Sequence, residues 1–389
     1  MSRRVVWLLA LTTGCVVANI YYVQPLLPDI ARSFGLSVTE VGVVAMLGMA
    51  GAGVGQFLFV PFGDIRERRG LIVGMTSAAA IACALAAAAQ NGIWMMAAML
   101  LVGFTAAVNH VTIPYAAHLA PPAQRGRVVG IVFSGLLFGI LLARTWSGWI
   151  GEIFHWRAVY AIASVTMALL AVLMRRLLPP SQPDIRLSWR ELIASVPPLW
   201  RDLPTLREAV IVNSLMFCAF NVFWTALVFF VEGPPYFYTS RGAGLFGLIG
   251  AAGALCAPLS GRLADRYGGR GNVLVAVLAM SSSFVILGLW GTNLVGLIIG
   301  VLVLDMAQQL AHVSNQTRIY GLIPEARSRL NMVYMTCSFT GGSLGSYFAT
   351  FWWHLAGWWG VCGFGLGLLL LALLAWWRIG RSAHVTRIS

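Results

Sequence analysis

Long apolar runs alternate with short polar turns along all 389 residues of the chain. Runs of about 18 or more apolar residues are typical of transmembrane helices, because lipid offers no hydrogen-bond partner to exposed backbone. The runs predict about twelve such helices, half of them in each half of the chain. Their approximate centres are Val16, Met49, Ala80, Phe104, Leu137 and Met167, followed by Phe217, Gly250, Met280, Asp305, Gly341 and Leu368.

The two halves repeat each other at a spacing of about 202 residues. Matching pairs are Asn19 and Asn221, His110 and His312, Gly139 and Gly341, and Trp156 and Trp358. A constant register over several regions indicates a duplicated unit. Symmetry between two membrane bundles is typical of transporters. We therefore expect an all-α membrane protein with two pseudo-symmetric six-helix bundles, residues 1–178 and 207–389.

A polar segment, residues 179–206, separates the two bundles and is broken repeatedly by proline. Within it, Ser188-Trp189-Arg190-Glu191 has the spacing of a capping box, which predicts a short helix. Its apolar residues beside Arg190 predict that this amphipathic helix lies on the inner membrane surface. We interpret the segment as a cytoplasmic linker.

Composition agrees with a membrane protein. The chain is 59% hydrophobic and 10% charged, and a soluble domain of this length needs far more charge on its surface. The net charge of +13 comes from arginine alone, because no lysine occurs. The arginines fall in alternate loops, with only Arg32, Arg157 and Arg241 on the opposite side, so the positive-inside rule predicts cytoplasmic termini. The basic charge therefore reflects topology in a bacterial inner membrane, and we expect no nucleic-acid partner.

The sequence gives no indication of an enzyme. It contains no H-E-x-x-H, G-x-S-x-G or G-x-x-x-x-G-K-[ST] pattern, and its six cysteines show neither metal-ligand nor disulfide spacing. We expect no metal and no cofactor, only a proton gradient as the energy source.

The turn after the eighth predicted helix reads Gly261-Arg262-Leu263-Ala264-Asp265-Arg266-Tyr267-Gly268-Gly269-Arg270, and a diverged copy follows the second helix. This loop resembles the signature loop of the major facilitator superfamily, and the resemblance covers the whole chain. It implies alternating access, with a cytoplasmic latch that holds the halves together and releases as they rock. In the first copy, Val60 and Glu67 replace the glycines, so that latch is looser or differently paired. The latch residues are Asp64, Arg68, Arg69, Gly261, Asp265, Arg266, Gly268 and Arg270.

The fifth predicted helix resembles the antiporter motif of the same family, with Gly130, Gly139 and Ser147-Gly148 at matching spacing. Arg144 stands at the motif's proline position. A charge inside the membrane costs about 2.5 kcal/mol or more, so it normally faces a cavity or a partner. Either Arg144 binds substrate, or it extends to the outer interface and only anchors the helix.

The tenth predicted helix carries a polar stripe at spacings of three and four residues. Its members are Asp305, Gln308, Gln309, His312, Asn315 and Gln316. Asp305 lies near the bilayer midplane, where transporters bind substrate and coupling ions. Because burial disfavours a charged carboxylate, we predict that Asp305 exchanges the coupled proton; a fixed ion pair with Arg144 is the alternative. His312 and its counterpart His110 are either proton relays or structural histidines.

The first predicted helix carries Asn19, Tyr22 and Gln24, with Asn221 and Trp224 at related positions in the seventh. These side chains suit a mixed aromatic and polar ligand, although interfacial aromatic anchoring is the alternative for Tyr22. We assign substrate binding to Asn19, Tyr22, Gln24, Arg144, Asn221, Trp224, Gln308, Gln309, Asn315 and Gln316.

The resemblance extends to a subgroup. Leu27-Pro28-Asp29-Ile30-Ala31 resembles a run of twelve-helix drug and sugar exporters, and Arg318-Ile319-Tyr320 resembles the arabinose efflux permease group. Together these features predict a monomeric, proton-coupled exporter of small organic molecules, such as a drug, a sugar or a metabolite. A facilitator or importer of a small organic anion that uses Arg144 is the alternative.

Overall fold

The computed structural model describes residues 2–181, 189–254, 257–323 and 326–385, with the side chains at 61, 64, 189, 251–254, 257–268 and 381–385 left out. Every regular element in these ranges is a helix. The chain divides into unit 1, residues 1–192 with 238–247, and unit 2, residues 193–237 with 248–389.

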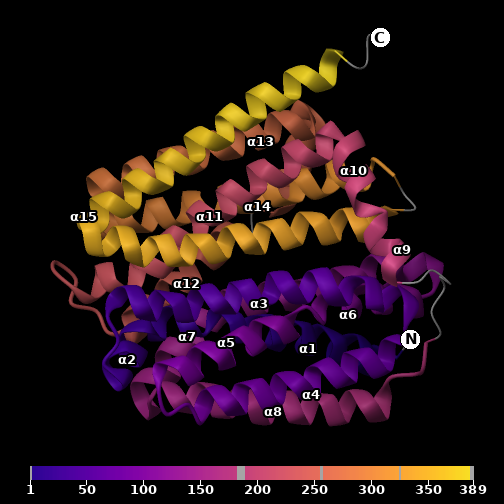
Figure 1. Cartoon of the computed structure of the whole chain (residues 1–389), viewed down its shortest axis with the longest axis horizontal. Helices are drawn as coiled ribbons and strands as arrows, with labels where there is room; N and C mark the ends of the chain where they lie inside the picture. The colour runs from indigo at the N-terminus through magenta and orange to yellow at the C-terminus, as the bar shows by residue number, and fades with distance from the viewer. Residues whose placement is uncertain (1, 182–188, 255–256, 324–325, 386–389) are drawn as a thin grey trace. The chain divides into compact units, whose positions relative to one another are not determined.

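Unit 1 is a bundle of long helices that lie side by side (Figure 1). Its closest helix pairs are α1 with α7, α3 with α5, and α4 with α8. Its elements are α1 (Arg3–Tyr21), α2 (Val23–Phe34), α3 (Val38–Ile65), α4 (Arg68–Ala87), α5 (Gly92–Ala106), α6 (Asn109–Leu119), the short 3-10 helix η1 (Pro122–Gln124), α7 (Arg125–Phe154) and α8 (Trp156–Leu177).

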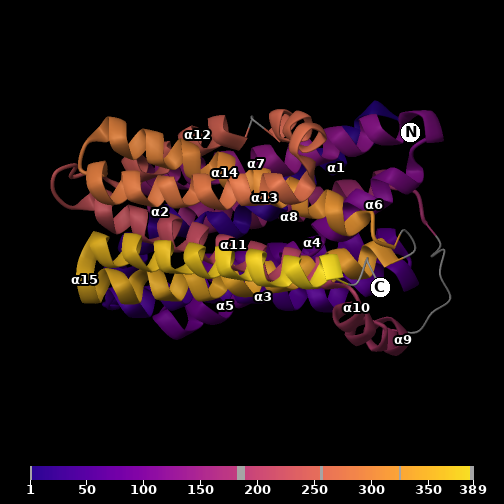
Figure 2. The same ribbon diagram turned by 90° about the horizontal axis from the view of Figure 1, so that it is seen from above.

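Unit 2 is built mainly on α11 packed against α15, and on α13 packed against α14. The short helices α9 (Trp189–Ala194) and α10 (Val196–Asp202) lead into it, and α10 packs on α11 and α15 at one end of the unit (Figure 2). The remaining helices are α11 (Pro204–Glu232), the end of α12 (Ser240–Ala254), α13 (Ala257–Trp290), α14 (Leu294–Tyr320) and α15 (Arg327–Val385). Residues 240–247 of α12 belong to unit 1.

The predicted all-helical membrane fold is confirmed. Within the described residues, 10 helical segments are long and apolar enough to cross a membrane. One of them is really two spans, because α15 folds back on itself at Ala356 and Gly357 (Figure 1). Gly357 has φ 57°, a left-handed conformation that favours glycine. The span predicted around Gly250 corresponds to α12 with the beginning of α13, on either side of residues 255–256.

Local sequence explains where several helices begin and end. Proline at position 25 has no N–H to bond the carbonyl of Tyr21, and the first transmembrane helix breaks there into α1 and α2. At the start of α3, Ser37 Oγ accepts from the N–H of Glu40 at 3.2 Å, and the Glu40 carboxylate accepts from the N–H of Ser37 at 2.8 Å. This capping box satisfies amide groups that the helix leaves free.

In each unit, a glycine at a helix crossing lets two backbones touch. A β-carbon at Gly139 of α7 would clash with the carbonyl oxygen of Gly14 on α1. The repeat counterpart of Gly139 is Gly341 of α15, where a β-carbon would clash with the carbonyl oxygen of Ser214 on α11. Small residues allow this close approach in lipid, where no hydrophobic effect draws the helices together. The duplicated glycines therefore make equivalent contacts in the two units.

A second repeat pair also has equivalent roles. The buried indole of Trp156 donates to Ser33 Oγ at 2.9 Å, and the buried indole of Trp358 donates to the carbonyl of Leu287 at 2.8 Å. A buried tryptophan needs such an acceptor for its N–H. Both tryptophans thus fix the packing of their own unit.

Candidate functional site

Arg144 lies inside unit 1, with a side chain only 2% exposed. Its Nε donates to Gln24 Oε1 on α2 at 2.6 Å, and its Cζ lies 4.9 Å from the centre of the Tyr21 ring. The amide oxygen and the aromatic face both stabilise a buried guanidinium. Gln24 lies at the start of α2, directly after Tyr22, where α1 and α2 are separated. Arg144 therefore does not extend to the surface of its unit.

Asn19 and Tyr22 are buried and line a cavity of about 620 Å³ between α1, α7 and α8. The Tyr22 ring packs edge-on against Tyr160, with 6.5 Å between ring centres. Tyr22 thus lies within the unit and not in a surface belt of aromatic side chains. The cavity also contains Ala143, the residue before Arg144.

Asp305 is 8% exposed in the middle of α14. At a rise of 1.5 Å per residue it lies roughly 17 Å from the start of the helix and roughly 23 Å from its end. A hydrocarbon core of about 30 Å therefore encloses it. Gly250 of α12 faces the carboxyl group, because a β-carbon there would lie 3.0 Å from Asp305 Cγ. The glycine thus permits the carboxyl group to sit against the α12 backbone.

The rest of the polar stripe on α14 continues toward the end of that helix. Gln308 is buried, whereas Gln309 and Gln316 are half-buried. The Oε1 atom of Gln308 and the Nε2 atom of Gln309 have no hydrogen-bond partner among the described residues. Unsatisfied amide groups of this kind are available to a polar ligand or water.

His312 lies one turn further along α14, half-buried beside Tyr334 of α15. The Tyr334 Oη and His312 Nδ1 atoms are 3.3 Å apart, and the ring centres are 5.6 Å apart. Either group can donate this hydrogen bond, depending on the tautomer of the imidazole. The counterpart His110 is half-buried on α6 of unit 1, where its backbone N–H donates to Ala107 at 3.0 Å.

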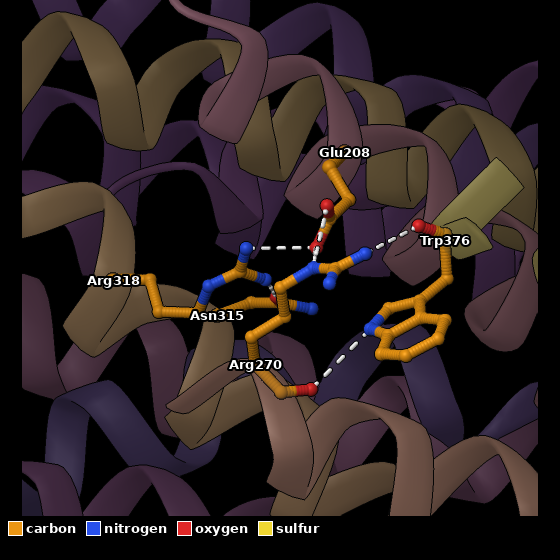
Figure 3. A network of polar contacts seen from close by, with 5 residues as sticks. All are labelled: Glu208, Arg270, Asn315, Arg318 and Trp376. Atoms are coloured by element: carbon orange, nitrogen blue, oxygen red, sulfur yellow. Dashed lines mark hydrogen bonds and ion pairs between the residues drawn. The ribbon is translucent and has the colours of Figure 1, made fainter. Parts of the chain in front are cut away.

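The stripe ends in a buried network of charges (Figure 3). The Glu208 carboxylate of α11 is 2% exposed and accepts from Arg270 Nε at 3.1 Å and from Arg318 at 2.7 Å. Arg318 also donates to Asn315 Oδ1 at 3.1 Å. Arg270 donates to the carbonyl of Trp376 at 2.7 Å and lies over its ring (Figure 3). The Glu208 carboxylate therefore links α11, α13 and α14, and the contact between Arg270 and Trp376 links α13 to α15.

Asn221 and Trp224 are buried on α11. Asn221 Nδ2 donates to the carbonyl of Phe217 at 2.9 Å, and its Oδ1 has no partner among the described residues. Trp224 packs against Phe220 and Phe223 in an aromatic cluster. Asn19 matches Asn221 closely, since both are buried amides with an unsatisfied oxygen.

In the first latch copy, Arg68 Nε donates to the carbonyl of Gly63 at 2.9 Å, and Arg69 donates to the carbonyl of Arg175. Glu67 caps α4 by accepting from the N–H groups of Arg69 and Gly70, and it also accepts from Ser181 at 3.0 Å. The residue that replaces a family glycine therefore binds the start of the linker segment.

Several expected latch side chains lie outside the described residues. They are Asp64, Gly261, Asp265, Arg266 and Gly268. Of the second copy, the structure describes the side chain of Arg270 and places it on Glu208.

Two acids were missed by sequence reasoning. Glu208 follows Arg207 at the beginning of a long apolar run, and an acid at that position is the available signal. Glu67 was noted only as a departure from the family pattern. Its position directly before α4, where an acid suits the positive end of the helix dipole, is the signal that was available.

The comparisons with known proteins agree with the all-helical membrane fold. The Major Facilitator Superfamily family model matches residues 9–346. The chain is 40% identical over 378 residues to the uncharacterized transporter YgaY of Escherichia coli O157:H7, covering 97% of this chain and 96% of that protein. It is 34% identical to a probable transporter of Streptomyces coelicolor, with 95% and 86% covered. A bacterial homolog to the human lysosomal transporter Spinster has a similar fold, with a TM-score of 0.76, 14% identity and 98% of each chain covered.

Proposed function

Because the chain belongs to the major facilitator superfamily, a family of non-enzymatic membrane transporters, we propose that it exports small organic molecules in exchange for protons. The single observation that carries proton coupling is the burial of the Asp305 carboxyl in the middle of α14. An ionised side chain at that depth costs about 2.5–3.5 kcal/mol, whereas the protonated carboxyl is neutral. Binding and release of a proton therefore change the energy of the site strongly.

The remaining stripe supplies a route for that proton. His312 lies seven residues beyond Asp305, roughly 10 Å along the helix, and contacts Tyr334. Asn315 and the Glu208 network follow toward the arginine-rich end of the helix. We assign coupling to Asp305, with His312 as a relay and His110 as its counterpart. Gln308, Gln309 and Gln316 complete the polar lining as substrate contacts, together with Asn315.

In unit 1 we assign substrate binding to Arg144, Gln24, Asn19 and Tyr22, and in unit 2 to Asn221 and Trp224. The buried amides and aromatic rings of this set suit a cargo with both apolar surface and hydrogen-bonding groups. The protein acts as a monomer in the inner membrane with both termini in the cytoplasm. We infer this orientation from the positive-inside rule, which assigns the arginine-rich end to the cytoplasm. Arg69 and Arg175 lie together at that end of unit 1, and Arg157 lies beside Ala89 at the other end.

The test begins with cells that differ only in this protein, grown on a panel of aromatic antimicrobials, dyes and sugars. A compound that the cells tolerate better is then added to proteoliposomes that contain pyranine, and the proton flux that it elicits is recorded. Asp305→Asn should abolish this flux while the protein remains in the membrane. The control is Asp202→Asn, which removes an exposed acid at the end of α10 and should leave the flux unchanged. Undiminished flux in Asp305→Asn would exclude the coupling assignment.

The buried guanidinium of Arg144, held by Gln24 and Tyr21, favours a second function, facilitated movement of a small organic anion. In that case, labelled benzoate should enter proteoliposomes without an imposed pH gradient. Arg144→Gln should stop the uptake, whereas Arg144→Lys keeps the charge and should retain part of it. Absence of benzoate uptake by the wild-type protein would reject this function.

A further inference from the structure

The second half of α15 holds the guanidinium of Arg270 through Trp376. Arg270 Nη2 donates to the carbonyl oxygen of Trp376 at 2.7 Å, and Arg270 Cζ lies 4.1 Å from the centre of the Trp376 ring (Figure 3). The indole N–H of Trp376 in turn donates to the backbone carbonyl of Arg270 at 3.3 Å. A carbonyl oxygen and an aromatic face both stabilise a guanidinium. Trp376 therefore contacts both the backbone and the side chain of Arg270.

Gly380 completes this contact one turn further along α15. Residues four apart lie on the same face of a helix, so Gly380 and Trp376 face the same neighbour. Gly380 is buried, and a β-carbon there would overlap Arg270 Nη2. The backbone at Gly380 is helical and does not itself require glycine. It is the position of the Arg270 guanidinium that requires glycine here.

Arg270 in turn contributes to the network at the end of the α14 stripe. Its Nε donates to the buried Glu208 carboxylate at 3.1 Å, and the same carboxylate accepts from Arg318 at 2.7 Å. Arg318 also donates to Asn315 Oδ1 at 3.1 Å. These contacts form one chain from the end of α15 to Asn315. The two α15 residues in this chain lie beyond residues 9–346, the part that the family model matches.

We propose that Trp376 and Gly380 are positioning residues for Arg270, and that through Arg270 and the Glu208 carboxylate they orient the stripe at Asn315. Displacement of Arg270 leaves the carboxylate with Arg318 alone, so that the carboxylate shifts toward α14. The end of α15 is thus part of the candidate site, although neither residue belongs to the stripe itself. The positioning of Arg270 is independent of any transported molecule, whereas the effect on cargo rests on the export function proposed above.

The first test measures the reactivity of the Arg270 guanidinium. Purified protein in lipid nanodiscs is treated with 2,3-butanedione, which modifies accessible guanidinium groups, and the modification rate of each arginine is followed by mass spectrometry. Arg327 is the internal control, because it is exposed at the beginning of α15. Gly367→Ala is the matched control variant on the same helix, because a β-carbon there meets nothing within 4 Å.

We expect Gly380→Ala and Trp376→Ala to speed modification of Arg270 by roughly three- to tenfold, which is the range that the loss of one net hydrogen bond gives. Trp376→Phe keeps an aromatic face and the backbone carbonyl, so its rate should stay close to that of the wild type. Gly367→Ala should not change the rate at Arg270, and no variant should change the rate at Arg327. Equal Arg270 reactivity in Gly380→Ala and Gly367→Ala overturns the proposal.

A second test separates positioning of Arg270 from helix packing alone. Gly380→Ala and Gly367→Ala gain the same helix propensity, so the difference between their Tm values reports the contact with Arg270. Gly380→Ala should melt about 2–4 °C lower, the shift that about one net hydrogen bond gives in a unit of this size. Arg270→Lys removes Nη2, so the difference should vanish in that background.

A Tm difference of equal size with Arg270 and with Arg270→Lys would overturn the proposal, because Gly380 would then serve packing only. If Gly380→Ala alone does not fold, the expected result is recovery of folded protein in the double variant Gly380→Ala/Arg270→Lys. Failure to recover it would overturn the proposal equally.

The effect on the stripe is measured in proteoliposomes, with the compound that the growth panel selects as the probe. The concentration of this compound that gives half-maximal proton flux should rise at least about threefold in Gly380→Ala and stay at the wild-type value in Gly367→Ala. An unchanged concentration in a Gly380→Ala protein whose Arg270 has become reactive would overturn the link to Asn315. A wild-type protein without flux would reject the export function, and the positioning of Arg270 would still be decided by the two tests above.

Discussion

Replacing Glu208 with glutamine keeps the shape of the side chain and removes the carboxylate that pairs with both Arg270 and Arg318 (Figure 3). At an effective dielectric constant of about 20, two unit charges about 4 Å apart attract each other by roughly 4 kcal/mol. Two such pairs give roughly 8 kcal/mol of attraction. Desolvation of the carboxylate and repulsion between the two guanidinium groups offset much of it.

The free energy of unfolding therefore falls by less than the full attraction between the charges. Removing one partner of a buried ion pair costs about 3–5 kcal/mol. The side chain of Arg270 is 32% exposed, so water stabilises it when the acid is lost, and we expect a loss at the lower end, about 3 kcal/mol. For a unit of this size, that loss lowers Tm by about 6–12 °C.

The measurement is the Tm of the purified protein in detergent, followed by intrinsic tryptophan fluorescence. Asp202→Asn removes an exposed acid from α10 and should change Tm by less than about 2 °C. The double variant Glu208→Gln/Arg318→Gln removes one of the two uncompensated cations. It should be less destabilised than the sum of its two single variants, because both changes act on one network. A Glu208→Gln protein that melts with the wild type, or a double variant whose losses simply add, would refute the charge argument.

Two further predictions concern other acids. Gly250→Ala should reduce Asp305-dependent proton flux in proteoliposomes, because its β-carbon would lie 3.0 Å from Asp305 Cγ. The control Gly74→Ala should leave the flux unchanged, because a β-carbon there meets nothing within 4 Å. Equal flux in the two variants would contradict the packing of Gly250 against Asp305. Burial is the largest single influence on the pKa of Glu67 and raises it, but the opposing contacts together hold that pKa below its usual range. These contacts are the backbone N–H groups of Ser181, Gly70 and Arg69 and the charge of Arg69. Since the folded pKa is depressed, the stabilisation is present above about pH 4.3 and is lost as pH falls through the folded pKa. The Tm difference between wild type and Glu67→Gln should therefore be constant from pH 7 to about pH 5 and shrink below about pH 4; a difference that grows on acidification would be inconsistent with this.

Helix number, helix type and the duplicated plan were predictable from the sequence, because apolar length and repeat register are local properties of the chain. The structure bears them out even at single residues, as in the matching glycine crossings and the paired tryptophans 156 and 358. The burial of Asp305 also followed from its place in a long apolar run.

The partners of the charged residues could not be predicted in the same way. Arg144 of α7 meets Gln24 of α2 across 120 residues of sequence, a contact that depends on how the two helices pack. Glu208 meets Arg270 and Arg318 across 62 and 110 residues of sequence, a contact that depends on how three helices pack. Glu208 is also a lone acid near the start of α11 and belongs to none of the arginine and glycine motifs.

Gly139 and Gly14 touch because neither residue has a side chain. This affects how freely the sequences of the two halves can diverge. An interaction between two specific side chains constrains both partners, so that drift at one position must be matched at the other. A backbone crossing constrains little beyond the absence of a side chain, and the surrounding surface is free to change. The ancestral scaffold could in this way persist in both descendants, while one copy acquired Glu67 and the other kept Gly268 at the related turn.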